Sequence, residues 1–191
     1  MLQASLQLIT EVGIDQVRLA EIARRAGMSS GQVMYYFTTK EHILLETLAW
    51  QEHEATGRRR AVLAEAADPW RQLERFIDLY LPCDTADPVW ILWTETWGRA
   101  PHDAEMSRFL DELMRPWYDD LAELAQRGEQ EGTFRLQVPP GDFTVCFCAL
   151  LDGLAIIHLT QKPYLTRERL IELAMATART QLTPVGPRGP A

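Results

Sequence analysis

Apolar residues recur every three to four positions along almost the whole chain, and no stretch alternates between apolar and polar residues as a half-buried strand does. This period predicts an all-α fold, with helices over residues 1–12, 19–26, 31–37, 39–56, 69–81, 89–99, 103–131, 143–159 and 165–182. Asp68-Pro69 and Thr166 are expected to begin two of these helices, because Asp and Thr cap helices and Pro suits the first helical position. Pro116 lies inside the longest helix and is expected to kink it or to free a backbone carbonyl.

The stretch over residues 19–40 has the most specific local pattern. Its first half places apolar residues on one helix face and is followed by Gly27, which can end a helix without the steric penalty of a Cβ atom. Ser29 or Ser30 can then cap a second helix. The inward-facing residues of that helix are expected to be Val33, Tyr36 and Phe37. A helix, a short turn with glycine and a second helix form the arrangement that lays the second helix in the major groove of DNA.

The same stretch resembles the DNA-binding domain of the TetR family of bacterial transcriptional repressors. The positions that carry the resemblance are Ile22-Ala23, Ala26-Gly27, Ser29, Gly31, Phe37, Lys40-Glu41 and the preceding run over residues 6–13. The resemblance implies a helix-turn-helix DNA-binding domain over residues 1–45 and a helical effector-binding and dimerisation domain over residues 46–182. Residues 183–191 are rich in Pro and Gly and are expected to form a disordered tail. We therefore expect a ligand-responsive repressor that a small apolar, aromatic or cationic effector releases from a palindromic operator.

The resemblance also implies which side chains meet the DNA. Gln32 is the candidate for a base contact, because its amide can bind a base edge through two hydrogen bonds. The full set of expected DNA-contacting residues is Arg18, Ser29, Ser30, Gly31, Gln32, Tyr35, Tyr36 and Lys40. For Tyr36, a place in the protein core is an equally good interpretation.

Three features depart from the family pattern. Arg18 stands where a capping Ser or Thr is common, Met34 stands where Tyr is usual, and the first helix lacks a preceding basic arm. Either the native chain begins upstream of Met1 or the arm is absent.

Aromatic residues gather in the second part of the chain, where Trp90, Trp93 and Trp97 share a helix face. Ligand sites between helices are mostly apolar and contain a few polar groups. The expected effector site consists of Tyr80, Trp90, Trp93, Trp97, Phe109, Trp117, Tyr118, Phe147 and Asp152, with Glu95 and His158 as further polar candidates. An ordinary core role is the alternative for each of these aromatic residues. A Trp-lined site suits an aromatic or cationic ligand. Residues 150–155 also resemble the sensor domains of choline-responsive relatives, while the identity of the effector stays open.

The segment over residues 143–159 is apolar nearly all round, which is typical of a helix that is buried on more than one side. One face is expected to pack on its own core, and the other is expected to pack on a second copy of the chain. Together with the last helix it would form a four-helix bundle, and the resemblance implies the same homodimer. The expected interface residues are Phe143, Leu150, Leu154, Ile157, His158, Ala174 and Ala178.

Charge and composition limit the compartment and the partners. The net charge is −8, yet residues 1–60 contain seven basic and seven acidic side chains, so the excess negative charge lies in the remainder. No apolar run approaches the roughly 20 residues of a membrane span, and no signal peptide opens the chain. Cys83, Cys146 and Cys148 lack metal-ligand spacing. We therefore expect a cytoplasmic protein with reduced cysteines and no membrane partner.

Two other classes of function compete with the repressor. An all-α enzyme is disfavoured because the histidines are scattered and the chain has neither an HExxH motif nor a Gly-rich phosphate loop. We accordingly expect no catalytic residues, no metal and no cofactor. The second alternative is a dimeric helical small-molecule-binding protein that has lost DNA binding. The features that favour it are the neutral net charge of the DNA-binding domain (the head), Arg18, Met34 and the short N-terminus. The expected partners are an operator in double-stranded DNA, a second copy of the chain and an unidentified small-molecule effector.

Overall fold

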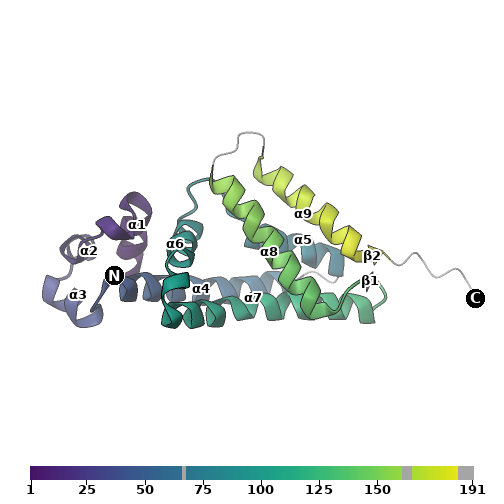
Figure 1. The fold of residues 1–191 in the computed structure, drawn as a ribbon, viewed down its shortest axis with the longest axis horizontal. Helices are drawn as coiled ribbons and strands as arrows, with labels where there is room; N and C mark the ends of the chain where they lie inside the picture. Colours follow the sequence, from purple (N-terminus) through teal and green to yellow (C-terminus); the bar gives the residue numbers. More distant parts are fainter. Residues whose placement is uncertain (66–67, 161–164, 185–191) are drawn as a thin grey trace, which may run out of the picture. The chain divides into compact units, whose positions relative to one another are not determined.

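Helices make up most of the computed structural model, which describes residues 1–65, 68–160 and 165–184 (Figure 1). This confirms the predicted all-α fold. In chain order the elements are α1 (Leu2–Val12), η1 (Ile14–Gln16), α2 (Leu19–Ala26), α3 (Ser30–Tyr36), α4 (Lys40–Glu65), α5 (Pro69–Tyr80), α6 (Pro88–Trp97), η2 (Ala100–His102), α7 (Ala104–Gln130), β1 (Phe134–Leu136), α8 (Pro140–Leu159), α9 (Arg167–Gln181) and β2 (Leu182–Pro184).

The chain divides into two compact units. The first contains residues 1–56 and 86–114, and the second contains residues 57–85 and those from 115 onwards. The two longest helices, α4 and α7, each contribute residues to both units. The expected boundary between residues 45 and 46 stays a prediction.

The first unit contains the predicted helix-turn-helix. α2 ends at Gly27, whose φ of +65° is a left-handed conformation that glycine adopts without strain. Ser29 begins α3, because its Oγ accepts a hydrogen bond from the backbone N–H of Gln32 at 3.2 Å. Val33 and Phe37 are buried where α3 packs against α2. The motif is confirmed, and the first of the two candidate serines is the cap.

The inward face of α1 ends before the apolar period of the helix does. Its buried residues are Ala4, Ser5, Leu8 and Ile9, whereas Val12 is 47% exposed. The helix ends at Gly13, and Ile14 of η1 takes the next position in the core. The apolar stripe therefore stops one turn earlier than the sequence period suggests.

Helix α4 is longer than expected and runs to Glu65 instead of ending near Thr56. Gly57 lies within it. Arg59 anchors the additional turns to α7, because its Nε lies 2.6 Å from Oδ2 of Asp120. A local sequence pattern does not reveal this long-range ion pair.

The second unit has α5, α8 and α9 side by side (Figure 1). Asp68 caps α5 by accepting a hydrogen bond from the backbone N–H of Arg71 at 3.0 Å, and Pro69 occupies the first turn. Thr166 caps α9 in the same way. Both predicted helix starts are confirmed, and α7 continues through Pro116.

Two short strands, β1 and β2, form an antiparallel pair that the sequence pattern does not predict. Leu136 pairs with Leu182, and Arg135 pairs with Thr183. Strands of three residues are too short to show an alternating pattern. Residues 183 and 184 were expected to belong to the disordered tail and instead lie in β2. The rest of the expected tail, residues 185–191, lies outside the described residues.

Helix α8 is 20 residues long and apolar enough to cross a membrane by length and composition alone. This corrects the expectation that no apolar run approaches that length. In its most apolar 18-residue window, 44% of the residues are buried inside the protein. The inward side carries Phe143, Phe147, Leu151 and Leu154, which belong to the core of the second unit.

Candidate DNA-reading helix and effector site

One side of α3 is exposed to solvent. Tyr35 is 83% exposed, Met34 is 61% exposed and Tyr36 is 54% exposed. The opposite side is fixed in the core by Val33 and Phe37. The structure thus decides against a core role for Tyr36 and places three large side chains on the surface of the expected reading helix.

Gln32 has a different role from the one expected for it. Its Oε1 accepts a hydrogen bond from the backbone N–H of Ser29 at 2.9 Å, while Ser29 Oγ accepts one from the backbone N–H of Gln32. This reciprocal pair is a capping box that holds the start of α3. Because the amide oxygen is engaged, a two-bond contact between Gln32 and a base requires that the box opens.

The basic residues of the head differ in how free they are. Arg24 pairs with Glu21, and Arg25 pairs with Glu11 at 2.5 Å. The Nζ of Lys40 donates to the backbone carbonyl of residue 15. Arg18, by contrast, forms no ion pair with any described residue and is exposed at the start of α2. Ser30 and Gly31 are also exposed, so the predicted contact residues share a surface that α2 and α3 present.

The residues expected to form the effector site fall into both units. Trp90, Trp93, Trp97 and Phe109 belong to the first unit. Tyr80, Trp117, Tyr118, Phe147 and Asp152 belong to the second.

In the first unit the three tryptophans of α6 contact one another. The ring centroids of Trp90 and Trp97 lie 5.8 Å apart, and those of Trp93 and Trp97 lie 5.3 Å apart. The Nε1 of Trp93 donates a hydrogen bond of 2.9 Å to Oε1 of Glu52, a carboxylate that is only 5% exposed. Glu95, expected as a polar anchor, instead pairs with Arg99 at 2.7 Å. Glu52 was not predicted, because its place in a helix with other charged residues gives no local signal.

In the second unit a carboxylate lies among aromatic rings. Tyr80 Oη donates a hydrogen bond of 2.7 Å to Oδ1 of Asp152. The Tyr80 ring lies edge-on to Trp117 with centroids 4.9 Å apart, and Phe76 contacts both rings. Phe147 stacks on Phe143 at 5.3 Å and belongs to the core.

The environment of Asp152 disfavours its charge. Burial raises the pKa of Asp152 from 3.8 to about 6, and the hydrogen bond from Tyr80 opposes part of that rise. Among the residues that the structure describes, no Lys, Arg or His forms an ion pair with Asp152. Burial also raises the pKa of the neighbouring Cys148 thiol to about 12, so this thiol stays protonated near neutral pH. The cluster therefore offers a buried negative charge that lacks a counter-ion.

A buried arginine lies against the same aromatic group. The guanidinium of Arg59 stacks over the ring of Trp117, 3.8 Å from the centroid, and its residue is 1% exposed. Its Nε donates to Asp120 at 2.6 Å, but its Nη1 and Nη2 have no hydrogen-bond partner among the described residues. Each buried donor without a partner costs roughly 1–3 kcal/mol. Arg59 stands between Arg58 and Arg60 in the sequence, and nothing in this run of arginines marks it as the buried one.

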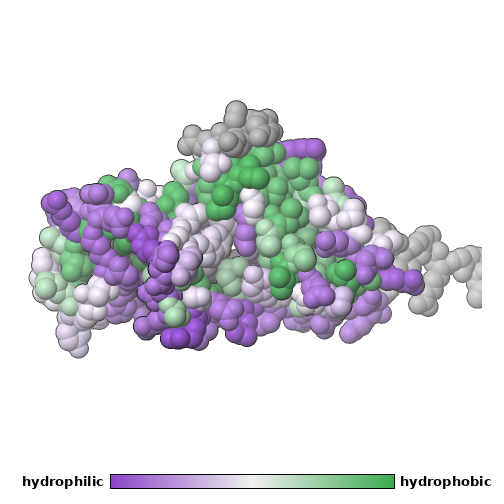
Figure 2. Space-filling view, viewed as in Figure 1, coloured by the Kyte–Doolittle hydropathy of each residue, from purple (hydrophilic) through white to green (hydrophobic). Residues whose placement is uncertain are grey.

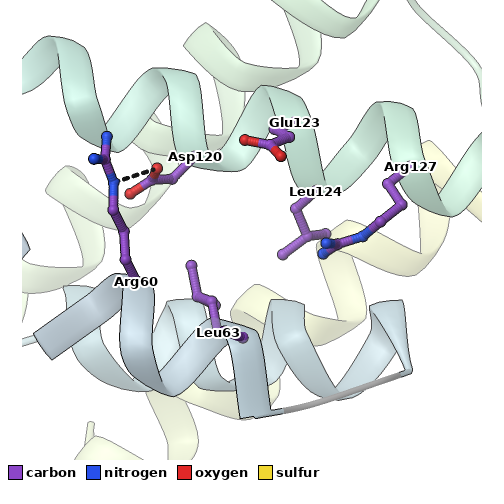
Figure 3. A pocket seen from close by; sticks show the side chains of 7 residues that line it. Arg60, Leu63, Asp120, Glu123, Leu124 and Arg127 are labelled. Carbon is purple, nitrogen blue, oxygen red and sulfur yellow. Dashed lines mark ion pairs between the residues drawn. The ribbon is translucent and has the colours of Figure 1, made fainter. Parts of the chain in front are cut away.

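A hollow of about 230 Å³ opens beside this ion pair (Figure 3). Its lining residues are Arg60, Leu63, Ala64, Asp120, Glu123, Leu124 and Arg127. Arg60 reaches the second oxygen of Asp120 at 3.5 Å. The hollow mixes both signs of charge, and its lining contains none of the residues expected for the effector site.

The structure corrects most of the residues expected at a dimer interface. Phe143, Leu154, His158, Ala174 and Ala178 are buried inside their own protomer, because α8 and α9 pack those sides against the core of the second unit. The Nδ1 of His158 lies 3.2 Å from the backbone oxygen of Leu165. Leu150 is half-buried, and Ile157 is 38% exposed. Because α8 carries apolar residues on all its sides, the sequence did not reveal which side faces outwards.

The outward side of α8 is also apolar. Val145 is 61% exposed, and Ile156 and Ile157 are 37% and 38% exposed. Ala149 and Gly153 lie on the same side. Figure 2 shows apolar side chains gathered over α8. We call these five residues the α8 outer stripe.

A helix-turn-helix head joined to a helical domain defines a DNA-binding transcriptional regulator. Residues 1–47 match the bacterial regulatory proteins of the tetR family, and residues 69–183 match the C-terminal domain of BetI-type transcriptional repressors. The chain is 26% identical to the HTH-type transcriptional regulator BetI of Proteus mirabilis over 169 residues, covering 86% of this chain and 81% of that protein. It is 30% identical to BetI of Paraburkholderia xenovorans over 128 residues, covering 63% of each.

Solved structures show the same fold. A transcriptional regulator from Saccharomonospora viridis in complex with choline aligns with a TM-score of 0.86 and 26% identity, covering 95% of this chain and 94% of that chain. A TetR-family regulator from Rhodococcus sp. aligns with a TM-score of 0.77 and 20% identity, covering 95% and 96%. This chain belongs to the TetR family, and its C-terminal region is of the BetI repressor type. The family predicted from the sequence is confirmed, and it is a family of transcriptional regulators rather than of enzymes.

Proposed function

We propose that this protein is a cytoplasmic repressor that binds a palindromic operator as a homodimer and is released by a small cation of the quaternary-ammonium class. The observation that carries the effector class is the Asp152 carboxylate, which is largely buried beside aromatic rings without a counter-ion. Aromatic rings together with a carboxylate are the chemistry that recognises such a cation. The Saccharomonospora viridis regulator, which aligns over 95% of this chain, was solved in complex with choline, a quaternary ammonium compound.

The effector cation would take the place of the missing counter-ion of Asp152. One oxygen of this carboxylate accepts the Tyr80 hydrogen bond, and the other makes no hydrogen bond with a described residue. Since the pKa of Asp152 is about 6, most of its carboxyl groups are ionised at pH 7 and above. The rings of Tyr80, Phe76 and Trp117 would supply the apolar wall against which the methyl groups of the cation pack.

Contact with DNA would come from the exposed side of α3. Tyr35 is its most exposed large side chain and can donate a hydrogen bond to a phosphate oxygen. Arg18 has a free guanidinium at the adjacent start of α2 and would add an electrostatic contact. Gln32 would hold the start of α3 through its capping box. Lys40 would contact DNA through the ammonium N–H groups that do not donate to the backbone carbonyl of residue 15.

The homodimer would form through the α8 outer stripe. Exposed apolar surface of this kind marks an interaction site, and a two-fold axis lets the same stripe meet its own copy. Gly153 would permit close approach, because a Cβ atom placed there meets no heavy atom within 4 Å. Two reading heads in one dimer match the two halves of a palindromic operator.

Release would follow from the continuity of α4, whose residues run without a break from Lys40 beside the reading head to Arg59 beside Trp117. An effector that binds one arrangement of the aromatic cluster more tightly shifts the population of the whole regulator toward that arrangement. The free energy available for release equals the difference between the binding free energies of the effector for the two arrangements.

The test is footprinting of the purified protein on the DNA upstream of its own gene, with and without choline. The proposal predicts a protected pseudo-palindrome that Tyr35→Ala weakens about fivefold or more and that choline removes, while the uncharged isostere 3,3-dimethylbutan-1-ol does not. Gln7→Ala, an exposed change in α1, is the matched control and should leave the footprint unchanged. Protection that choline leaves intact overturns the proposed effector class. The absence of any protected site overturns the proposed operator binding and favours a small-molecule-binding protein that does not bind DNA.

A further inference from the structure

The structure assigns the two unpaired amino groups of Arg59 to an acceptor group of the effector, so we infer that the preferred effector is a zwitterion that carries a carboxylate as well as a quaternary ammonium. This inference rests on the proposed function and adds the second charge of the ligand. It concerns the same aromatic cluster in the second unit.

Arg59 is held in a fixed orientation and keeps two donors for a ligand. The Asp120 carboxylate and the Trp117 ring fix the guanidinium plane, through the 2.6 Å hydrogen bond from Nε and the 3.8 Å stacking distance. Nη1 and Nη2 remain without a partner, although the residue is 1% exposed. Both are donors on one edge of a rigid planar fork, and that edge matches the two oxygens of a carboxylate.

The charges of the cluster favour a ligand with both signs. Arg59 stacks over the ring of Trp117, the rings of Trp117 and Tyr80 form a T-shaped pair, and Tyr80 donates to Asp152. A chain of direct contacts thus connects the two Nη donors of Arg59, which have no partner among the described residues, with a carboxylate that has no counter-ion among them. A bare cation would satisfy Asp152 and leave the amino groups of Arg59 unpaired, whereas a carboxylate linked to the cation would satisfy both.

An alternative that uses no ligand is the burial of ordered water against Nη1 and Nη2. Water would satisfy the donors equally well with either kind of effector. It therefore predicts no preference between a cation and a zwitterion, and this difference separates the two explanations.

The experiment is isothermal titration calorimetry of the full chain with four probes: choline, glycine betaine, and their uncharged-carbon isosteres 3,3-dimethylbutan-1-ol and 3,3-dimethylbutanoate. We expect glycine betaine to bind about tenfold or more tightly than choline, as a two-bond charged contact provides. Arg59→Met should remove this preference, because it should weaken glycine betaine about tenfold more than it weakens choline. Arg60→Met is the matched control, because Arg60 also pairs with Asp120 but is exposed, and it should preserve the preference.

Arg59→Lys provides the same comparison if the methionine variant does not fold, since Lys keeps the charge but cannot present two parallel N–H groups. Equal affinity of the wild type for choline and glycine betaine overturns the inference, and so does an equal loss of both in the Arg59 variants. Those results leave the proposed cation site intact. Isosteres that bind as tightly as their ammonium counterparts, or failure of both ammonium compounds to bind at millimolar concentration, overturn the cation site and the inference together.

Discussion

Replacing Asp152 by Asn should stabilise the effector-free protein while it removes effector binding. The folded state raises the pKa of this carboxyl from 3.8 to about 6 through burial. The folded protein therefore binds the proton more tightly than the unfolded chain does, and ionisation at neutral pH works against folding. A rise of roughly two pKa units corresponds to about 3 kcal/mol at 1.36 kcal/mol per unit, which is the upper limit of the gain. Asn keeps the size of the side chain and an oxygen that accepts the Tyr80 hydrogen bond.

The sign of the effect fixes its pH dependence. At pH 7.5 the penalty is complete, because the carboxyl is ionised in both states. Between pH 6 and pH 4 the penalty fades as the folded and then the unfolded protein take up the proton, and at pH 5 about half of it remains. The stability advantage of Asp152→Asn should shrink over the same interval.

Urea unfolding of the wild type and the variant at pH 7.5, 5 and 4 measures this difference. Asp119→Asn is the matched control, since Asp119 is an exposed carboxylate on α7, and its effect should be small at every pH. A variant that is less stable than the wild type at pH 7.5 would refute the reasoning, as would a difference that does not change with pH. Either result would mean that Asp152 is a satisfied structural group and not a binding group kept at the expense of stability.

Three further predictions concern the pH dependence of effector binding, the cap of α3 and the dimer interface. Effector affinity should fall about tenfold between pH 7 and pH 5, because protonation removes the Asp152 charge, and calorimetry at the two pH values measures the loss. Ser29→Ala should lower the free energy of unfolding by about 1 kcal/mol through loss of the capping box, whereas Ser30→Ala should have little effect in the same urea titration. Val145→Asp should convert the dimer to a monomer in analytical ultracentrifugation, while Val138→Asp, the same substitution at an exposed valine outside α8, should not. A Val145 variant that stays dimeric would place the interface elsewhere.

Local signals in the sequence predicted the head and the helix starts correctly. Gly27, Ser29, Asp68 and Thr166 act within a few residues of their own positions, so their neighbours in the sequence were sufficient to place them. Neighbouring residues could not show in the same way whether Gln32 caps the helix or contacts a base. A Gln three residues after a capping Ser fits both a capping box and a base contact, and only the geometry shows which bond is made.

The effector cluster and the outer face of α8 depended on long-range packing. The pairing of Tyr80 with Asp152 joins residues far apart in the chain, and the burial of Arg59 depends on Asp120 and Trp117 in another helix. Periodicity cannot distinguish a buried arginine from its exposed neighbours. It also could not orient α8, because a helix that is apolar on all sides has no polar side to mark the solvent.

The central claim is that a quaternary ammonium at Asp152 releases the reading heads from DNA. Fluorescence anisotropy of a labelled operator, measured at pH 7.5 while choline or glycine betaine is added, tests it directly in the wild type and in Asp152→Asn. Both proteins should bind the operator with the same affinity, and the ammonium compounds should release only the wild type. Release of both proteins at the same effector concentration would contradict it, because the carboxylate of Asp152 would then have no part in recognising the effector.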